Sequence, residues 1–170
     1  MTHRKTTRGT RIERDLLGSK RVPAEAYYGV QTLRALENFR ISGVPAHHFP
    51  DLVRGLAMVK LAAARANAEL GALPKRVLRG IEAACARLLA GEHHDQFSVD
   101  MFQGGAGTST NMNANEVIAN LALEHLGHSR GEYEHCDPHD HVNLSQSTND
   151  AYPTALHVAM LLANDTLVEE

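Results

Sequence analysis

Two segments of the chain carry more small polar side chains than a packed helical core needs. The first is GGAGTSTNMNANE, residues 104–116, and the second is DPHDHVNLSQSTNDAYPT, residues 137–154. Each contains the predicted start of a helix, where unbonded N–H groups and the positive end of the helix dipole favour an anion. The residue types therefore make both segments candidates for binding a small carboxylate.

The first segment combines glycines with hydroxyls. Glycine lets the backbone approach a ligand closely, and Thr108, Ser109 and Thr110 supply O–H groups. No Gly-Lys-Ser/Thr follows, so this is not a nucleotide-binding P-loop, and no strand is predicted before it, as a dinucleotide fingerprint requires. A glycine-rich turn followed by a Ser/Thr helix cap is the alternative interpretation.

The second segment contains a helix-capping pattern, with Ser147 followed three residues later by Asp150. A helix cap accounts for the Ser147 hydroxyl and the Asp150 carboxylate. It does not explain the polar side chains that crowd beside them, which are Asn143, Gln146, Thr148 and Asn149. Neutral hydroxyls and amides at a helix start can hold a carboxylate in place and leave its charge available for reaction.

Other polar residues are given structural interpretations. Zinc is not predicted, because the spacing of His135, Cys136, His139 and His141 matches no usual pattern of ligand pairs. No metal ligand and no cofactor is assigned. Cys85 is predicted to lie in the core. Surface or loop positions are predicted for the remaining candidates, which are Glu13, Arg14, Asp15, His47, His48, His93 and His94.

Helices must position the two polar segments. Apolar residues spaced three and four apart predict helices over about 51–71, 74–91 and 108–126, and another from about Thr148. A further helix is predicted over about 24–39 after a segment of turns or a small hairpin, with Tyr28, Leu33, Leu36 and Phe39 on its buried side. The helix from Thr148 is expected to bury Leu156, Ala159, Met160, Ala163 and Leu167. The fold class is mainly α, with a long polar loop over 128–150.

Composition excludes several classes of protein. The 170 residues are 43% hydrophobic and carry a formal charge of −3, which suits one globular domain and argues against a nucleic-acid binder. No apolar run reaches the roughly 18 residues that a membrane span needs. Two cysteines form no disulfide framework, so a cytoplasmic location is expected.

Three stretches of the chain closely resemble the aspartase/fumarase superfamily. They are RIERDLLGSKRVPAEAYYGVQTLRALENF, DQFSVDMFQGGAGTSTNMNANEVIAN and GEYEHCDPHDHVNLSQSTNDAYPTALH. The resemblance covers nearly the whole chain from Arg11 onward. Within the superfamily the sequence is more similar to aspartate ammonia-lyases, because Thr148 and Tyr152 stand where class II fumarases typically have Ser and Phe.

The resemblance implies a reaction and a set of residues. Such enzymes remove a Cβ proton from a dicarboxylate such as L-aspartate, form an aci-carboxylate dianion and expel ammonia to give fumarate. By motif, Thr108, Ser147 and Thr148 would donate to the carboxylate that gains charge, and Asn149 with Thr108 would position the amine. Asp137 stands where fumarases place a histidine of a secondary carboxylate site, so that site is not expected to bind acid here.

The resemblance also implies missing parts. The catalytic base of the superfamily is a serine in a GSSxMPxKxN loop, and residues 1–170 contain no such pattern. We therefore expect a disordered tail over 1–10, an N-terminal lyase domain over 11–145 and the truncated start of a central helical bundle over 146–170. The full-length form is expected to be a homotetramer, and this chain alone inactive. Two alternatives stay open: a class II fumarase, and a non-catalytic assembly or binding module.

Overall fold

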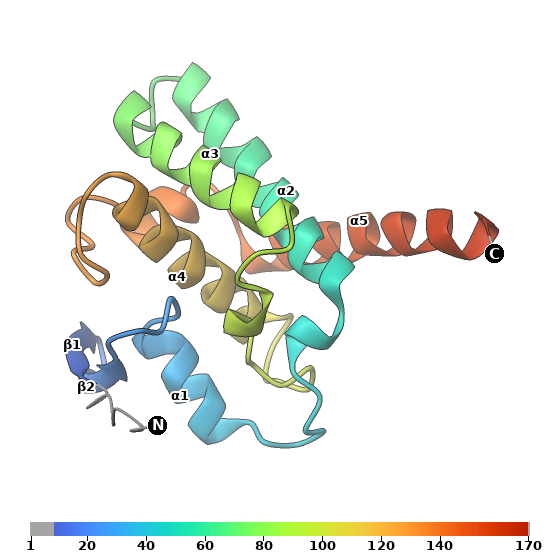
Figure 1. The fold of residues 1–170 in the computed structure, drawn as a ribbon, viewed down its shortest axis with the longest axis horizontal. Coiled ribbons are helices and arrows are strands. Elements are labelled where there is room, and N and C mark those ends of the chain that lie inside the picture. Colours follow the sequence, from blue (N-terminus) through green and yellow to red (C-terminus); the bar gives the residue numbers. More distant parts are fainter. Residues whose placement is uncertain (1–8, 170) are drawn as a thin grey trace, which may run out of the picture.

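The computed structural model describes residues 9–169. A two-stranded hairpin is followed by five α-helices, and Figure 1 shows α4 running through the middle of the body with the hairpin and α1 on one side and α2 with α3 on the other. The elements are β1 (Thr10–Asp15), β2 (Gly18–Pro23), α1 (Val30–Asn38), α2 (Pro50–Glu69), α3 (Lys75–Leu89), α4 (Thr108–His125) and α5 (Thr148–Glu169). Short 3-10 turns lie at Ala46–His48 and His94–Gln96, and a π-helical turn at Pro138–Val142. The mainly helical class is confirmed.

The small hairpin confirms one sequence prediction and corrects another. β1 and β2 pair antiparallel, from Thr10 opposite Pro23 to Asp15 opposite Gly18. The predicted helix over 24–39 begins too early, because the chain stays in the hairpin to Pro23 and α1 starts only at Val30. Residues 1–8 of the predicted tail lie outside the described part, and Thr10, assigned to that tail, begins β1.

The start of α1 is fixed by a buried carboxylate from α4. Glu116 accepts hydrogen bonds from the backbone N–H groups of Gly29 (2.8 Å), Gln31 (2.7 Å) and Thr32 (3.0 Å), and from the Thr32 hydroxyl (2.6 Å). These are the N–H groups that the first turn of a helix leaves unpaired. The register of α1 is therefore set by a residue more than 80 positions away, and the local pattern did not contain that information.

A second carboxylate completes this cluster. Glu13 was predicted to lie at the surface, but it is buried and accepts from the Val30 N–H at 2.8 Å and from Arg11 Nε at 2.7 Å. Asp15 is likewise engaged, because the Arg34 guanidinium donates to both of its oxygens. This ion pair lowers the pKa of Asp15. The surface prediction is thus wrong for both acids, since each holds α1 against the hairpin.

Replacing Glu116 with alanine is expected to destabilise the protein by about 3 kcal/mol, because several buried donors lose their acceptor. Burial raises the pKa of Glu116 to about 7 against an ordinary value of 4.5. The ionised form is therefore disfavoured in the folded state, so this group's contribution is fully present below pH 4.5 and is lost as the pH rises through about 7. Urea unfolding at acid and alkaline pH measures both effects. Glu69→Ala, at an exposed position, is the control.

The core is built where small residues let helices approach closely. A Cβ at Gly80 of α3 would lie 3.1 Å from Ala122 Cβ of α4, and one at Gly55 of α2 would lie 2.4 Å from the Ala155 carbonyl oxygen of α5. Cys85 is fully buried between these helices, as predicted. The bounds predicted for the helices that became α2, α3 and α4 are confirmed to within two residues.

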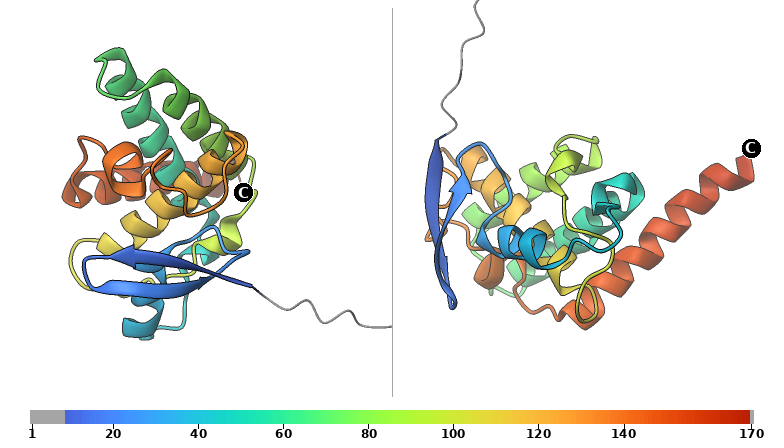
Figure 2. Two further views of the ribbon diagram at one scale, coloured as in Figure 1. Left: turned by 90° about the vertical axis from the view of Figure 1, so that its left-hand side faces the viewer. Right: turned by 90° about the horizontal axis from the view of Figure 1, so that it is seen from below.

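Helix α5 packs through alanines and projects from the body. Ala151, Ala155 and Ala159 are buried, whereas the larger residues predicted for the buried face, Leu156, Met160 and Leu167, are 37%, 62% and 72% exposed. Figure 2 shows the last turns of α5 extending away from the other helices. The prediction is confirmed for Ala159 and wrong for the larger residues, because the contact with α2 is too close for leucine. None of the helices in residues 9–169 combines the length and apolar character that crossing a membrane requires.

Candidate anion site at two helix starts

The structure brings the two polar segments together at the starts of α4 and α5. Gly107 precedes α4 with φ of 86°, and a Cβ built on it would lie 2.2 Å from Cγ of Tyr152 in the first turns of α5. Glycine therefore allows the two helix starts to approach closely. It also adopts a backbone conformation that other residues rarely adopt. Gln103 caps α4 by accepting from the Thr110 N–H at 2.8 Å.

Gly107→Ala is expected to lower the stability by about 2 kcal/mol, because a methyl group strains the left-handed backbone and collides with the Tyr152 ring. Thermal unfolding measures this loss. Gly71→Ala is the matched control, because Gly71 also has positive φ (75°) but nothing within 4 Å of its Cβ position; equal losses in both variants would show that only backbone strain matters.

A buried lysine lies beneath the second segment. Lys60 of α2 is fully buried, and its ammonium donates to Asn111 Oδ1 (2.7 Å), Asn143 Oδ1 (2.8 Å) and Gln146 Oε1 (2.9 Å). All three acceptors are neutral amides, so the positive charge is not neutralised by these contacts. Burial lowers the pKa of Lys60 to about 7. Such a group favours a nearby anion, which would stabilise its charged form.

Hydrogen bonds connect this ammonium to Thr148. Asn111 accepts from Lys60 through Oδ1 and donates through Nδ2 to Thr148 Oγ1 at 3.1 Å. Because Thr148 Oγ1 accepts this bond, its own proton can point to a ligand. The positive charge polarises the chain of bonds and makes the hydroxyl a better donor. Lys60 and Asn111 thus prepare one donor at the start of α5.

The four sequence-predicted residues lie around this arrangement. Thr108 is the exposed first residue of α4 and Asn111 follows one turn later on the same helix face. Ser147 is exposed at the start of α5, where its Oγ accepts from the Asn149 N–H at 3.2 Å, so its predicted capping role is confirmed. Asn149 is exposed and Thr148 half-buried. Of the four, Ser147 lines an open hollow of about 570 Å³, together with His139, Asp140, Asn143, Leu144, Ser145 and Gln146.

The loop that forms this hollow is fixed to α2. Ser145 has a φ of 60°, which is uncommon for a residue other than glycine. Its hydroxyl donates to Asn67 Oδ1 at 2.9 Å, while Asn67 Nδ2 donates to the Leu144 carbonyl at 2.9 Å. Asn67 is itself buried in α2. The polar loop is therefore rigidly placed by side chains from a core helix.

Lys60 and Asn67 were missed by the sequence analysis, although a signal existed. Leu56, Lys60 and Ala64 recur at steps of four, which places Lys60 on the buried stripe of α2. A lysine at such a position must find acceptors or a counter-ion. The periodicity alone did not identify those partners, which come from α4 and from the 143–146 loop.

The cysteine, aspartate and histidine side chains of residues 136–141 have different environments. Cys136 is fully buried, and burial raises its pKa to about 12. Asp137 caps the π-helical turn by accepting from the N–H groups of His139 and Asp140, both at 2.7 Å. His141 Nδ1 accepts from the Asp137 N–H at 2.8 Å. Asp137 therefore has a structural role in this loop.

Comparison with known proteins identifies the family to which this chain belongs. A family model described as "Lyase" matches residues 18–170. The chain therefore belongs to this lyase family, and the resemblance found in the sequence is confirmed.

Two relatives of this chain are aspartate ammonia-lyases. The aspartate ammonia-lyase of Pseudomonas aeruginosa is 64% identical over 159 residues, covering 94% of this chain and 34% of that protein. The aspartate ammonia-lyase of Escherichia coli strain K12 is 57% identical over 160 residues, with the same coverages. The chain thus spans about a third of the length of the curated relatives it matches.

Solved structures share the fold. A fumarate lyase:delta crystallin from Brucella melitensis superposes with a TM-score of 0.90 at 58% identity, covering 92% of this chain and 36% of that one. A class II fumarase from Schistosoma mansoni has a TM-score of 0.81 at 38% identity, covering 90% and 32%. The higher identity to ammonia-lyases agrees with the sequence resemblance at Thr148 and Tyr152.

Proposed function

We propose that this chain is part of an aspartate ammonia-lyase, which reversibly eliminates ammonia from L-aspartate to give fumarate. The observation that carries the proposal is the chain of hydrogen bonds from the buried Lys60 ammonium through Asn111 to the Thr148 hydroxyl. This places a polarised donor beside a helix N-terminus, which suits a carboxylate that gains charge. The identities of 64% and 57% to aspartate ammonia-lyases support this substrate.

In this proposal the two helix starts stabilise the intermediate. Removal of the Cβ proton turns the adjacent carboxylate into an aci-carboxylate dianion, and the electron pair then forms the C=C bond as the C–N bond breaks. Thr108, Ser147 and Thr148 donate to the dianion. Asn149, with Thr108, positions the amine. The proton is only weakly acidic, so donors directed at the developing charge supply much of the rate enhancement.

The base and the remaining site come from elsewhere in the complete protein. We assign the base to a serine loop of the GSSxMPxKxN type, which residues 1–170 do not contain. The complete enzyme is a homotetramer in this proposal, with α5 as the start of its central bundle. The exposed Met160, Leu161, Leu167 and Val168 of α5 support such burial by further helices. Two buried free thiols, Cys85 and Cys136, support a cytoplasmic location.

The test is a substrate comparison with the complete protein. Fumarate formation is followed by its ultraviolet absorbance, with L-aspartate in one assay and L-malate in the other. Rapid formation from aspartate and little from malate is the expected result. Preference for malate would identify a fumarase instead, and turnover of neither substrate would favour a binding or assembly module.

Residues 1–170 alone are expected to produce no fumarate from L-aspartate, because they contain donors but no base. The measurement is the same assay with the purified chain, run beside the complete protein at equal subunit concentration. Circular dichroism shows whether the chain is helical under the assay conditions. Turnover that co-purifies with a folded 170-residue chain would contradict the assignment of the base to another segment.

A further inference from the structure

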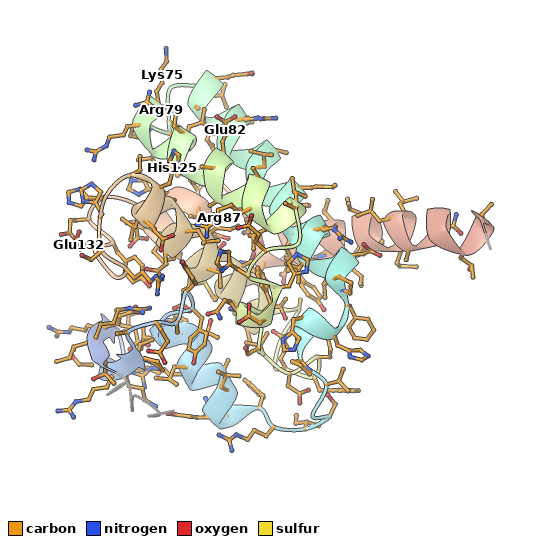
Figure 3. All side chains as sticks on the ribbon, in the orientation of Figure 1. Lys75, Arg79, Glu82, Arg87, His125 and Glu132 are labelled. Atoms are coloured by element: carbon orange, nitrogen blue, oxygen red, sulfur yellow. The ribbon has the colours of Figure 1, made fainter. Side chains whose placement is uncertain are left out.

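Three potential metal ligands converge in the turn that follows α4. Single ligand atoms of His128, Glu132 and His135 all lie within 4.8 Å of one another. Figure 3 shows Glu132 on the loop beyond the end of α4 at which His125 lies. Thr108 begins the same helix, and an 18-residue helix is roughly 27 Å long, so this cluster lies far from the two helix starts.

Backbone hydrogen bonds fix the turn that carries these side chains. The His128 N–H donates to the Leu123 carbonyl at 2.9 Å, and the His135 N–H donates to the Glu132 carbonyl at 3.1 Å. Glu132 Oε2 accepts from the Ser129 N–H at 3.0 Å. Asn120 Oδ1 of α4 accepts from the Gly131 N–H at 2.8 Å. The backbone of the turn is thus preorganised, which reduces the entropy lost when an ion binds.

The contacts of His128 show which ring nitrogen faces the cluster. Nδ1 lies 3.4 Å from Glu132 Oε2, whereas Nε2 lies on the opposite side of the ring, 2.7 Å from Arg76 Nη2. An ion held together with Glu132 must therefore bind Nδ1. A metal-bound imidazole carries its hydrogen on the other nitrogen and cannot accept there, so the Arg76 hydrogen bond is lost when an ion binds.

We infer that His128, Glu132 and His135 form a site for a divalent transition-metal ion of the Zn²⁺ or Co²⁺ kind. Imidazole and carboxylate ligands suit these ions, whereas Mg²⁺ and Ca²⁺ prefer sites made of oxygen alone. The rings of His128 and His135 stack with their centroids 3.7 Å apart and an angle of 17° between planes. Binding therefore rotates one ring, so that both lone pairs meet at the ion, and ends the hydrogen bond from Arg76 to His128 Nε2. The ion ties the turn together at three points.

The experiment titrates the complete protein, stripped with a chelator and dialysed, with Zn²⁺ by calorimetry and with Co²⁺ by visible absorption. One ion per subunit is expected. Glu132→Gln and His135→Asn should each weaken binding at least about tenfold. His157→Asn, which removes an exposed histidine of α5, is the matched control and should bind normally. Circular dichroism of each metal-free variant checks the fold.

The variant Arg76→Gln distinguishes metal binding from a purely structural role of the three side chains. Removing the guanidinium lets Nε2 of His128 carry the ring hydrogen and removes a repelling positive charge, so Zn²⁺ should bind several-fold more tightly to Nδ1. Weaker or unchanged binding in this variant would overturn the assignment of Nδ1 as a ligand. Absence of saturable binding, or equal binding by Glu132→Gln, His135→Asn and the unchanged protein, would overturn the site. None of these readouts depends on catalytic turnover.

Discussion

Thr148→Val should lower kcat/KM for L-aspartate by about 10²–10³-fold in the complete protein, because one donor to the developing charge is lost. Valine keeps the shape of threonine but has no hydroxyl. The fold should survive, since Asn111 Nδ2 retains its second acceptor, Asn143 Oδ1, at 3.0 Å. Steady-state kinetics measure the loss, and thermal unfolding verifies that the variant is folded.

Two further variants test whether the loss of activity is caused by the Thr148 hydroxyl itself. Thr148→Ser restores the O–H group and should recover most of the activity. Thr154→Val is the matched control on the same helix, because the Thr154 hydroxyl is exposed and donates only locally, to Asp150 Oδ1 at 3.3 Å. If Thr148→Val and Thr154→Val had equal kcat/KM, Thr148 would not be a donor to the reacting carboxylate.

Lys60→Met should reduce the free energy of unfolding by about 3 kcal/mol, because three amide oxygens in or beside the core lose their donor. Activity should fall too, since Asn111 no longer orients the Thr148 hydroxyl. Lys60→Arg is not a conservative change here, because the planar guanidinium does not match three acceptors around one nitrogen. Lys75→Met, at an exposed position of α3, is the control.

The same lysine predicts a pH dependence with a definite sign. Its pKa is about 7 in the folded protein against an ordinary value of 10.5, so the unfolded chain binds more protons between these values. The stability of the unchanged protein should therefore rise with pH through this window, and Lys60→Met should lack that contribution. Urea unfolding at about pH 7 and about pH 9 compares the two proteins. Identical pH profiles would contradict a buried, titrating ammonium.

Local patterns were sufficient for α2 to α4, for the start of α5 and for the position of the polar residues. Apolar spacing and glycine stops defined α2, α3 and α4, and the cap at Ser147 defined the start of α5. These features depend on residues close in sequence, so they can be recognised without the fold. The family resemblance added the roles of Thr108, Ser147, Thr148 and Asn149.

Long-range contacts explain what the sequence analysis missed. The start of α1 depends on Glu116 of α4, and the alanine face of α5 depends on the close approach of Gly55 in α2. Lys60 finds its three acceptors on α4 and on the 143–146 loop. A carboxylate or an ammonium in a sequence does not reveal its distant partners, so local patterns cannot predict these contacts.

A crystal structure of the complete protein with fumarate or succinate bound tests the proposed substrate site most directly. We expect a carboxylate at the starts of α4 and α5, with its oxygens accepting from the hydroxyls of Thr108, Ser147 and Thr148. The Lys60–Asn111–Thr148 hydrogen bonds should be intact in that complex. A dicarboxylate bound elsewhere, with these hydroxyls facing water, would contradict the proposal that the two helix starts form the substrate site.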